Sequence, residues 1–305
     1  MPKNHPFFLC LLLLCSVSIS LRAQSDSVSD MQPVESEAFE VMQQFFDYDQ
    51  TVPLEADVIG RLEKPGYIRE RISFRGALGS KVPGYLALPT NKMGPYPVVL
   101  LLHGVTSSKE SWWEENSTMR KLTIQLLESG YAALSLDTEY HGERSSNNEL
   151  DSPIALLENE RFVQYRDMIM RSTIDYRRGM DYLTTRTEID TTRIGMIGYS
   201  MGGMMTFMLS AVDSRIKTSV ACVSPIVTVP YLPTGVHHHA PYIHEVPFLM
   251  LMGKNDGQNY TEAQARQLHD LIGSDTKELI FFDSGHMLPA EWTDRAVYWI
   301  GKHLN

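Results

Sequence analysis

From residue 96 onward, short unbroken apolar runs alternate with longer segments whose apolar residues recur at helical spacing. The runs are YPVVLLLHG (96–104), YAALSLD (131–137), RIGMIGY (193–199), IKTSVACV (216–223), PFLMLMG (247–253) and ELIFFD (278–283). A strand that is apolar at every position is buried on both faces, as a parallel sheet covered by helices requires. The alternation therefore predicts an α/β fold, a three-layer sandwich with one mostly parallel sheet.

The segments between these runs are the expected helices. They comprise residues 111–130, a long helix with Tyr165, Ile169, Tyr176, Met180 and Leu183 on one face, and residues 201–212, 261–272 and 291–304. Before them, the strand-like runs 67–74 and 83–89 flank the turn signal GALGSK, which predicts an antiparallel start to the sheet. Residues 36–49 are expected to include a short amphipathic helix with Phe39, Met42, Phe45 and Phe46 on one side.

Residues 1–23 have the pattern of a signal peptide. Lys3 provides a positive start, FFLCLLLLCSVSIS is too short to span a bilayer comfortably, and Ala23 precedes a suitable cleavage point. We expect export to the periplasm or medium, with no stable membrane span after cleavage; an uncleaved anchor is the alternative. Residues 24–50 are expected to form an acidic lead-in with the short helix, and residues 51–305 one domain.

The charge balance argues against nucleic acid as a partner. The chain carries 37 acidic and 27 basic residues, a formal net charge of -10, and no basic cluster. Such a surface repels phosphate backbones.

Two of the three cysteines lie in the predicted signal peptide, so Cys222 would have no intrachain disulfide partner after cleavage.

The stretch GYSMGG (198–203) places three glycines around Ser200, directly between a predicted strand and a predicted helix. This context is typical of a nucleophile elbow, a strained turn that exposes a serine hydroxyl and demands small residues two positions before and after it. A bare G-x-S-x-G is a weak signal, but its position between strand and helix makes it a strong one. Ser200 is therefore the predicted nucleophile.

A serine nucleophile needs a histidine base and a carboxylate, expected in the chain order Ser, acid, His. Asp256 follows one late strand in LMGKNDGQ, and His286 follows the next in FFDSGHMLP. Asp283 lies too close to His286, and Asp137 and Glu139 follow the wrong strand. We therefore predict Asp256 as the acid and His286 as the base.

Two backbone N–H groups are expected to bind the oxyanion. One belongs to Met201, the residue after the nucleophile, and the other to the loop HGVTSSKE, where Val105 is the first choice and Thr106 the alternative. Irregular segments 140–160 and 225–246 follow strand ends, so we expect them to wall the substrate pocket.

Trp112, Trp113, His141 and Tyr199 are candidate pocket residues, although a tryptophan here is equally suited to packing under its helix. The charged cluster DTEYHGERS (137–145), which contains His141, is suited either to positioning a substrate or to bracing the loop.

Adjacent histidines at His237, His238 and His239 lack the spaced partners of a metal site, so neither a metal nor another cofactor is expected.

These motifs together resemble the α/β-hydrolase superfamily, and within it the secreted bacterial esterases similar to dienelactone hydrolases and acetyl esterases. The resemblance runs from about Phe46 to the C-terminus, through HGVTSSKE, DTEYHGERS, RIGMIGYSMGG, GKND and DSGH. It implies Ser200 as nucleophile, Asp256 as acid and His286 as base. Dienelactone hydrolases proper carry a cysteine nucleophile, so the serine here favours ordinary carboxylic esters.

The sequence thus predicts a serine esterase that acts on a small-molecule or carbohydrate ester with a short acyl chain. A peptidase or amidase similar to prolyl oligopeptidases, without their propeller, is the first alternative. A non-catalytic binding protein of the same fold is the second.

Overall fold

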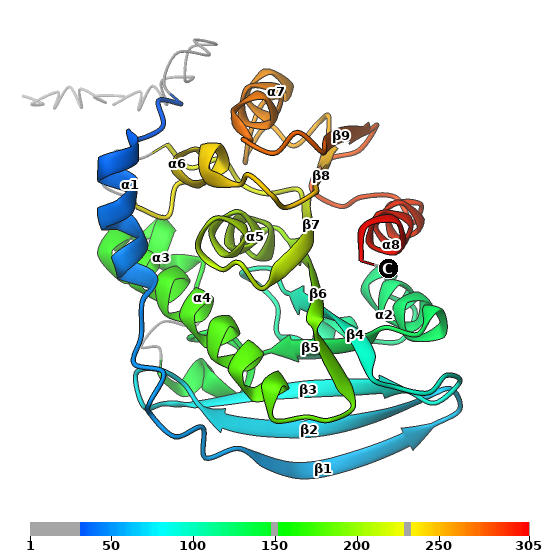
Figure 1. The fold of residues 1–305 in the computed structure, drawn as a ribbon. Coiled ribbons are helices and arrows are strands. Elements are labelled where there is room, and N and C mark those ends of the chain that lie inside the picture. Colours follow the sequence, from blue (N-terminus) through cyan, green and yellow to red (C-terminus); the bar gives the residue numbers. More distant parts are fainter. Residues whose placement is uncertain (1–30, 148–151, 229–232, 305) are drawn as a thin grey trace, which may run out of the picture.

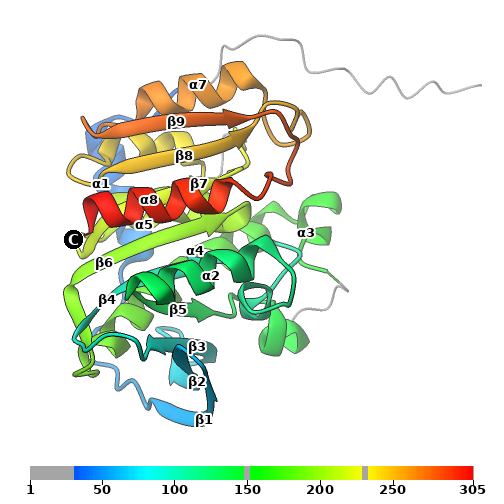
Figure 2. The same cartoon turned by 90° about the vertical axis from the view of Figure 1, so that its right-hand side faces the viewer.

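The computed structural model describes residues 31–147, 152–228 and 233–304. These residues form a nine-stranded sheet in the order β1-β2-β3-β5-β4-β6-β7-β8-β9, with helices on both faces (Figures 1 and 2). The predicted signal peptide, residues 1–23, lies outside the described residues. None of the helices in the described ranges is long and apolar enough to cross a membrane.

The sheet begins antiparallel and becomes parallel, as predicted. Its strands are β1 (Asp57–Lys64), β2 (Tyr67–Arg75), β3 (Lys81–Pro89), β4 (Tyr96–Leu102), β5 (Ala132–Leu136), β6 (Ile189–Tyr199), β7 (Ile216–Cys222), β8 (Phe248–Gly253) and β9 (Lys277–Phe282). Strands β1, β2, β3 and β5 pair antiparallel in that order, whereas β5, β4, β6, β7, β8 and β9 pair parallel. Strand β1 escaped prediction because, at the edge of the sheet, it is largely exposed and lacks an apolar pattern.

Helices cover the two faces of this sheet. They are α1 (Ser36–Gln43), α2 (Thr118–Ser129), α3 (Ala155–Glu158), α4 (Phe162–Thr184), α5 (Met201–Val212), α6 (Val236–His239), α7 (Glu262–Leu271) and α8 (Trp292–His303). Short 3₁₀ turns are η1 (Gln44–Phe46), η2 (Lys109–Trp112), η3 (Gly142–Asn147) and η4 (Ala240–Tyr242). Helices α2 and α8 pack together on one face, and α4 and α5 pack on the other (Figure 1). The predicted three-layer α/β sandwich is confirmed.

Two local predictions were wrong. The helix expected over 111–130 begins only at Thr118, because the Ser117 side chain accepts a hydrogen bond from the Arg120 N–H and caps the helix there. It ends at the left-handed Gly130, as the sequence indicated. In the N-terminal helix, Phe39, Met42 and Phe46 are buried, but Phe45 points to solvent and is 52% exposed.

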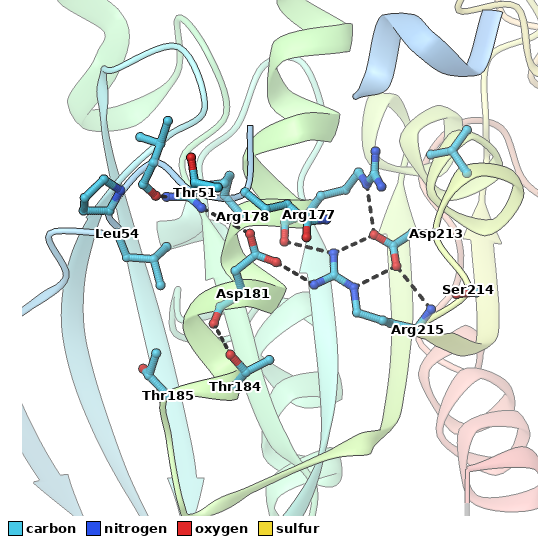
Figure 3. A pocket seen from close by; sticks show the side chains of 14 residues that line it. Thr51, Leu54, Arg177, Arg178, Asp181, Thr184, Thr185, Asp213, Ser214 and Arg215 are labelled. Carbon is cyan, nitrogen blue, oxygen red and sulfur yellow. Dashed lines mark hydrogen bonds and ion pairs between the residues drawn. The ribbon is translucent and has the colours of Figure 1, made fainter. Parts of the chain in front are cut away.

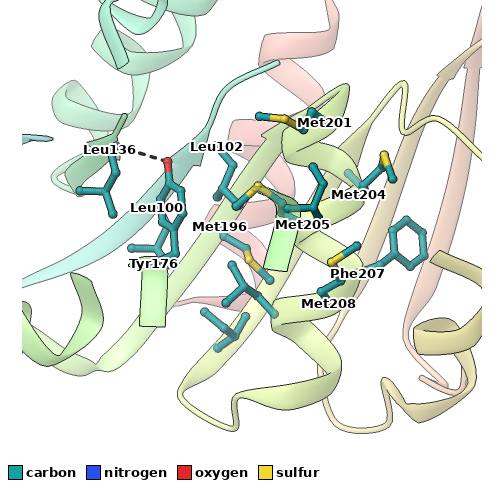
Figure 4. Close-up of a cluster of buried hydrophobic side chains, with 14 of the residues drawn as sticks. Leu100, Leu102, Leu136, Tyr176, Met196, Met201, Met204, Met205, Phe207 and Met208 are labelled. Carbon is teal, nitrogen blue, oxygen red and sulfur yellow. Dashed lines mark hydrogen bonds between the residues drawn. The ribbon is translucent and has the colours of Figure 1, made fainter. Parts of the chain in front are cut away.

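The core between the sheet and α5 fixes the position of Ser200 (Figure 4). The side chains of Met204, Met205 and Met208 on α5 are buried against the sheet and α4. Tyr176 on α4 donates a hydrogen bond of 2.7 Å to the Leu101 carbonyl, and its hydroxyl accepts one from the Leu136 N–H. A core packed this densely holds the start of α5 rigidly at the end of β6.

Candidate functional site

Ser200 occupies the sharp turn between β6 and α5. Its backbone has φ 56° and ψ -117°, a conformation that side-chain-bearing residues rarely adopt. A Cβ at Gly198 would collide with the Gly202 carbonyl oxygen, and a Cβ at Gly202 with the Leu102 carbonyl oxygen. Both positions require glycine because neighbouring backbone atoms leave no space for a side chain. This is the reason for which the sequence predicted small residues on either side of Ser200.

The structure brings Ser200, His286 and Asp256 together. The Nε2 atom of His286 lies 2.9 Å from the Ser200 hydroxyl oxygen, and its Nδ1 lies 2.7 Å from an Asp256 carboxylate oxygen. The three residues follow β6, β9 and β8, parallel strands whose carboxyl ends meet at one edge of the sheet. Asp256 is 4% exposed and Ser200 8%, so both residues that flank the imidazole are buried.

Two further side chains hold this arrangement, and the sequence did not reveal either role. The amide Nδ2 of Asn259 donates a hydrogen bond of 2.7 Å to the second Asp256 oxygen and lies 3.1 Å from His286 Nδ1. The Tyr199 hydroxyl donates one of 2.8 Å to the His286 carbonyl and accepts one from the Leu288 N–H. Asn259 lies in an irregular turn, where no periodic pattern marks a functional side chain.

The loop after β4 runs beside the serine. A Cβ on Gly104 would lie 3.4 Å from the Ser200 Cβ, so this loop and the turn at Ser200 are in van der Waals contact. Val105 and Thr106, the two residues predicted for one oxyanion donor, line the same cavity as Ser200. So does Met201, the residue predicted for the other, which is the first residue of α5.

A cavity of about 740 Å³ opens at this edge of the sheet. Ser200 and His286 are among the residues that line it. Apolar side chains contribute much of its wall: Val105, Trp112, Met119, Ile154, Leu157, Tyr165, Ile226, Val227 and Met287. Both irregular segments contribute to the wall, since Ile154 and Leu157 belong to 140–160 and Ile226 and Val227 to 225–246. A cavity of this size and character suits a mostly apolar small molecule.

Of the four predicted pocket residues, the structure places only Trp112 and Tyr199 at this cavity. Trp113 does not line the cavity: its ring packs against Tyr67 and Tyr85 and beneath the Arg69 guanidinium, which is 4.8 Å from the ring centre, so the packing alternative applies to it. His141 does not line the cavity either: its ring is buried and hydrogen-bonds to the Val105 carbonyl, which agrees with the alternative that this segment braces the loop.

The histidine cluster lies on α6, away from the serine. His239 is fully buried, its Nε2 donates a hydrogen bond to the Pro233 carbonyl, and its ring packs edge-on against Phe39 and Phe46. Burial lowers the pKa of His239 to about 4, so the ring is neutral at physiological pH. Across the described part of the chain, no group of three or more metal-ligating side chains is spaced to hold an ion.

A second cavity, of about 700 Å³, lies at the other end of the parallel strands, beside the residues that precede β6 and β7 (Figure 3). Arg177, Arg178 and Arg215 line it, and their guanidinium groups are ion-paired with Asp181 and Asp213. The network ties α4 to the loop between α5 and β7. None of the predicted site residues lies in this cavity.

Comparisons with known proteins place the chain in a family. The model of the dienelactone hydrolase family matches residues 82–285, about two thirds of the chain; the match includes Ser200 and Asp256 and ends one residue before His286. A protein of Bacillus subtilis (strain 168) named "Putative hydrolase YtaP" is 30% identical over 152 residues, which is 48% of this chain and 49% of that protein. The chain thus spans about half the length of this curated relative.

Solved structures show the same fold. Acetyl xylan esterase 1 from Thermoanaerobacterium sp. JW/SL YS485 superposes with a TM-score of 0.69 at 15% identity, covering 90% of this chain and 95% of that one. A cold-adapted esterase from an Arctic intertidal metagenomic library superposes with a TM-score of 0.63 at 21% identity, covering 85% and 100%. At such identities the likeness establishes the α/β-hydrolase fold alone, whereas the family match rests on the sequence itself. The chain belongs to the dienelactone hydrolase family.

Proposed function

We propose that this chain is a serine hydrolase that cleaves carboxylic esters through an acyl-enzyme. The observation that carries the proposal is the pair of contacts at His286: Nε2 lies 2.9 Å from the Ser200 hydroxyl and Nδ1 lies 2.7 Å from the Asp256 carboxylate. A base within hydrogen-bond reach of a nucleophile, itself oriented by a third group, is the arrangement that activates a serine hydroxyl. Family membership supports the same reaction class.

The proposed reaction has two halves. Ser200 Oγ attacks the ester carbonyl carbon while His286 Nε2 takes its proton, and the collapse of the tetrahedral intermediate expels the alcohol, which receives that proton. A water molecule that gives a proton to His286 then attacks the acyl-serine, and the second tetrahedral intermediate collapses to release the carboxylic acid while His286 returns the proton to Ser200 Oγ. Asp256 keeps the imidazole oriented through Nδ1 and stabilises the imidazolium that forms in each half.

Backbone N–H groups would stabilise the negative charge on the carbonyl oxygen. Met201 supplies one from the start of α5, where the helix dipole also favours negative charge. Val105 supplies the other, with Thr106 as the alternative. Each such donor is worth about 10²–10³ in rate.

The proposed substrate is a small-molecule or carbohydrate ester with a short acyl chain. The cavity of about 740 Å³ far exceeds an acetyl group, so it has room for the alcohol part of the substrate as well. Similarity to an acetyl xylan esterase supports acetyl esters as the first to test.

The test is a set of initial rates on p-nitrophenyl esters from acetyl to decanoyl and on one aminoacyl anilide, for the wild type and Ser200→Ala. We expect rapid acetyl or butyryl ester turnover that the variant loses, together with fluorophosphonate labelling of the wild type only. Faster cleavage of long chains would overturn the short-acyl proposal, and preference for the anilide would indicate a peptidase. No turnover and no labelling would favour a binding protein.

A further inference from the structure

A largely buried segment contacts the loop that follows β4. Residues 137–141 connect β5 to η3, and several of their polar groups bond to the loop at residues 103–109. His141 makes the contact closest to the proposed oxyanion donors. Its ring is 3% exposed and is not among the side chains that line the cavity.

His141 forms a hydrogen bond with the loop backbone itself. The distance from its Nε2 to the Val105 carbonyl oxygen is 2.8 Å. Its Nδ1 lies 2.9 Å from the Thr138 hydroxyl and 2.7 Å from the Glu139 carbonyl oxygen. The ring is therefore fixed at both nitrogens inside the protein.

The chemistry of these partners defines which nitrogen donates. A carbonyl oxygen accepts hydrogen bonds and donates none, so Nε2 must carry a proton to bond Val105. A bond from Nδ1 to the Glu139 carbonyl likewise needs a proton on Nδ1, so only the doubly protonated ring donates to both carbonyls. Of the two neutral forms, the ring protonated on Nε2, with Thr138 donating to Nδ1, keeps the bond to Val105, whereas the ring protonated on Nδ1 bonds Glu139 instead. Burial lowers the pKa of His141, while its bonds to the Glu139 and Val105 carbonyls act in the opposite direction. The hydrogen bond to Val105 thus requires the proton on Nε2.

Holding the Val105 carbonyl also orients the next N–H group. The Val105 carbonyl and the Thr106 N–H belong to one planar trans peptide, so the direction of the carbonyl determines the direction of the N–H. The Gly104 carbonyl, in the peptide that carries the Val105 N–H, is held in the same way: it accepts a hydrogen bond from His103 Nδ1 at 2.9 Å. Thr138 joins the two histidines, because its N–H donates to His103 Nε2 and its hydroxyl lies beside His141.

We propose that His141 is a positioning residue for oxyanion stabilisation: its hydrogen bond to the Val105 carbonyl fixes the Val105–Thr106 peptide, which carries the Thr106 N–H and directly follows the peptide that carries the Val105 N–H. The inference rests on the proposed ester hydrolysis and adds a residue that acts through the backbone. A preorganised donor contributes to rate only while it stays aimed at the developing charge. Loosening this peptide therefore weakens the binding of the transition state more than that of the substrate.

Loss of His141 leaves the loop otherwise anchored. At its far end, the Lys109 N–H and ammonium group both bond to the Asp137 carboxylate, at 3.0 and 2.7 Å, and Lys109 also pairs with Glu143. Both Lys109 and Asp137 are almost fully buried. A variant at position 141 is therefore expected to fold with the loop in place and only the middle peptides free to turn.

The experiment compares His141→Leu and His141→Gln with the wild type and Ser200→Ala. Leucine keeps apolar volume and removes the donor, whereas the glutamine amide can again donate to the Val105 carbonyl. For His141→Leu we expect kcat on the preferred ester to fall about 100-fold, with KM within about threefold, since one misdirected donor costs about 10²–10³. We expect His141→Gln to recover most of kcat. The affinity of a trifluoromethyl ketone, which forms an oxyanion on Ser200, should fall in parallel with kcat.

The other outcomes separate this inference from the proposed function. If the wild type is active and His141→Leu keeps kcat within threefold, His141 only fills space and the inference is overturned. The inference would also be overturned if His141→Leu and His141→Gln lost kcat/KM equally, through both a lower kcat and a higher KM, and were both less thermally stable than the wild type. If the wild type neither cleaves esters nor reacts with a fluorophosphonate, the proposed function itself fails and this inference fails with it.

Discussion

The hydroxyl of Tyr199 donates a hydrogen bond of 2.8 Å to the backbone carbonyl of His286. The residue before the predicted nucleophile thus holds the segment that carries the predicted base, although 86 positions separate Ser200 from His286 in the chain. The same hydroxyl accepts a bond from the Leu288 N–H. The alignment of the imidazole on Ser200 consequently depends on a side chain that has no part in the chemistry.

Tyr199→Phe should loosen the segment around His286. The change leaves the His286 carbonyl and the Leu288 N–H without their partner, at a cost of about 1–3 kcal/mol. We expect faster amide hydrogen exchange over residues 284–288 and a lower kcat. Tyr298→Phe, at a position 68% exposed, is the control and should change neither. Unchanged exchange in Tyr199→Phe would show that the segment is held by other contacts.

Asn259→Ala should reduce turnover by releasing the Asp256 carboxylate. A hydrogen bond to a charged group contributes about 1.5–3 kcal/mol, so we expect kcat to fall about tenfold or more. Gln258→Ala is the matched control, because Gln258 lines the same cavity and is its neighbour in sequence. Equal kcat values for the two variants in steady-state kinetics would contradict the role assigned to Asn259.

Gly202→Ala should be strongly destabilising. Its Cβ would enter the space of the Leu102 carbonyl oxygen, and neither β4 nor α5 can move away because both are buried in the core. We expect the free energy of unfolding to fall by about 3 kcal/mol or more, measured by urea denaturation. Gly60→Ala on the exposed edge strand meets its nearest side-chain atom at 3.7 Å and should be close to neutral. A stable Gly202→Ala would mean that the turn tolerates a side chain.

The buried His239 should make folding stability depend on pH. Its pKa is about 4 in the folded chain, against about 6.5 when unfolded. The stabilisation associated with the neutral ring is fully present above pH 6.5 and is lost as the pH falls toward 4, with about 2 kcal/mol lost by pH 5.

His239→Gln should therefore flatten the pH dependence. Glutamine can still donate to the Pro233 carbonyl but does not titrate, so we expect the loss in unfolding free energy between pH 7.5 and 5 to shrink by about 2 kcal/mol. The partly exposed His303→Gln is the control, with a smaller expected change. Urea unfolding at the two pH values measures both, and identical slopes for His239→Gln and wild type would contradict the prediction.

Much of the fold could be predicted because its signals are local. The unbroken apolar runs at β4 and β6 indicate strands buried on both faces, and the glycines beside Ser200 indicate a turn with no space for side chains. Strand β1 shows the limit of such reasoning. Its residues are exposed on both faces, so its place in the sheet comes from backbone pairing with β2, which leaves no pattern in the side chains.

The sequence by itself determined the chemistry-bearing residue types and the strand ends on which Ser200, Asp256 and His286 lie. Only the tertiary structure decided which side chains support them. His141 was a candidate for the pocket and instead hydrogen-bonds to the Val105 carbonyl, Trp113 packs against two tyrosines, and Asn259 carried no signal. The physical reason is range: a strand or turn is specified by residues close in sequence, whereas the direction of a loop side chain depends on packing against segments far along the chain.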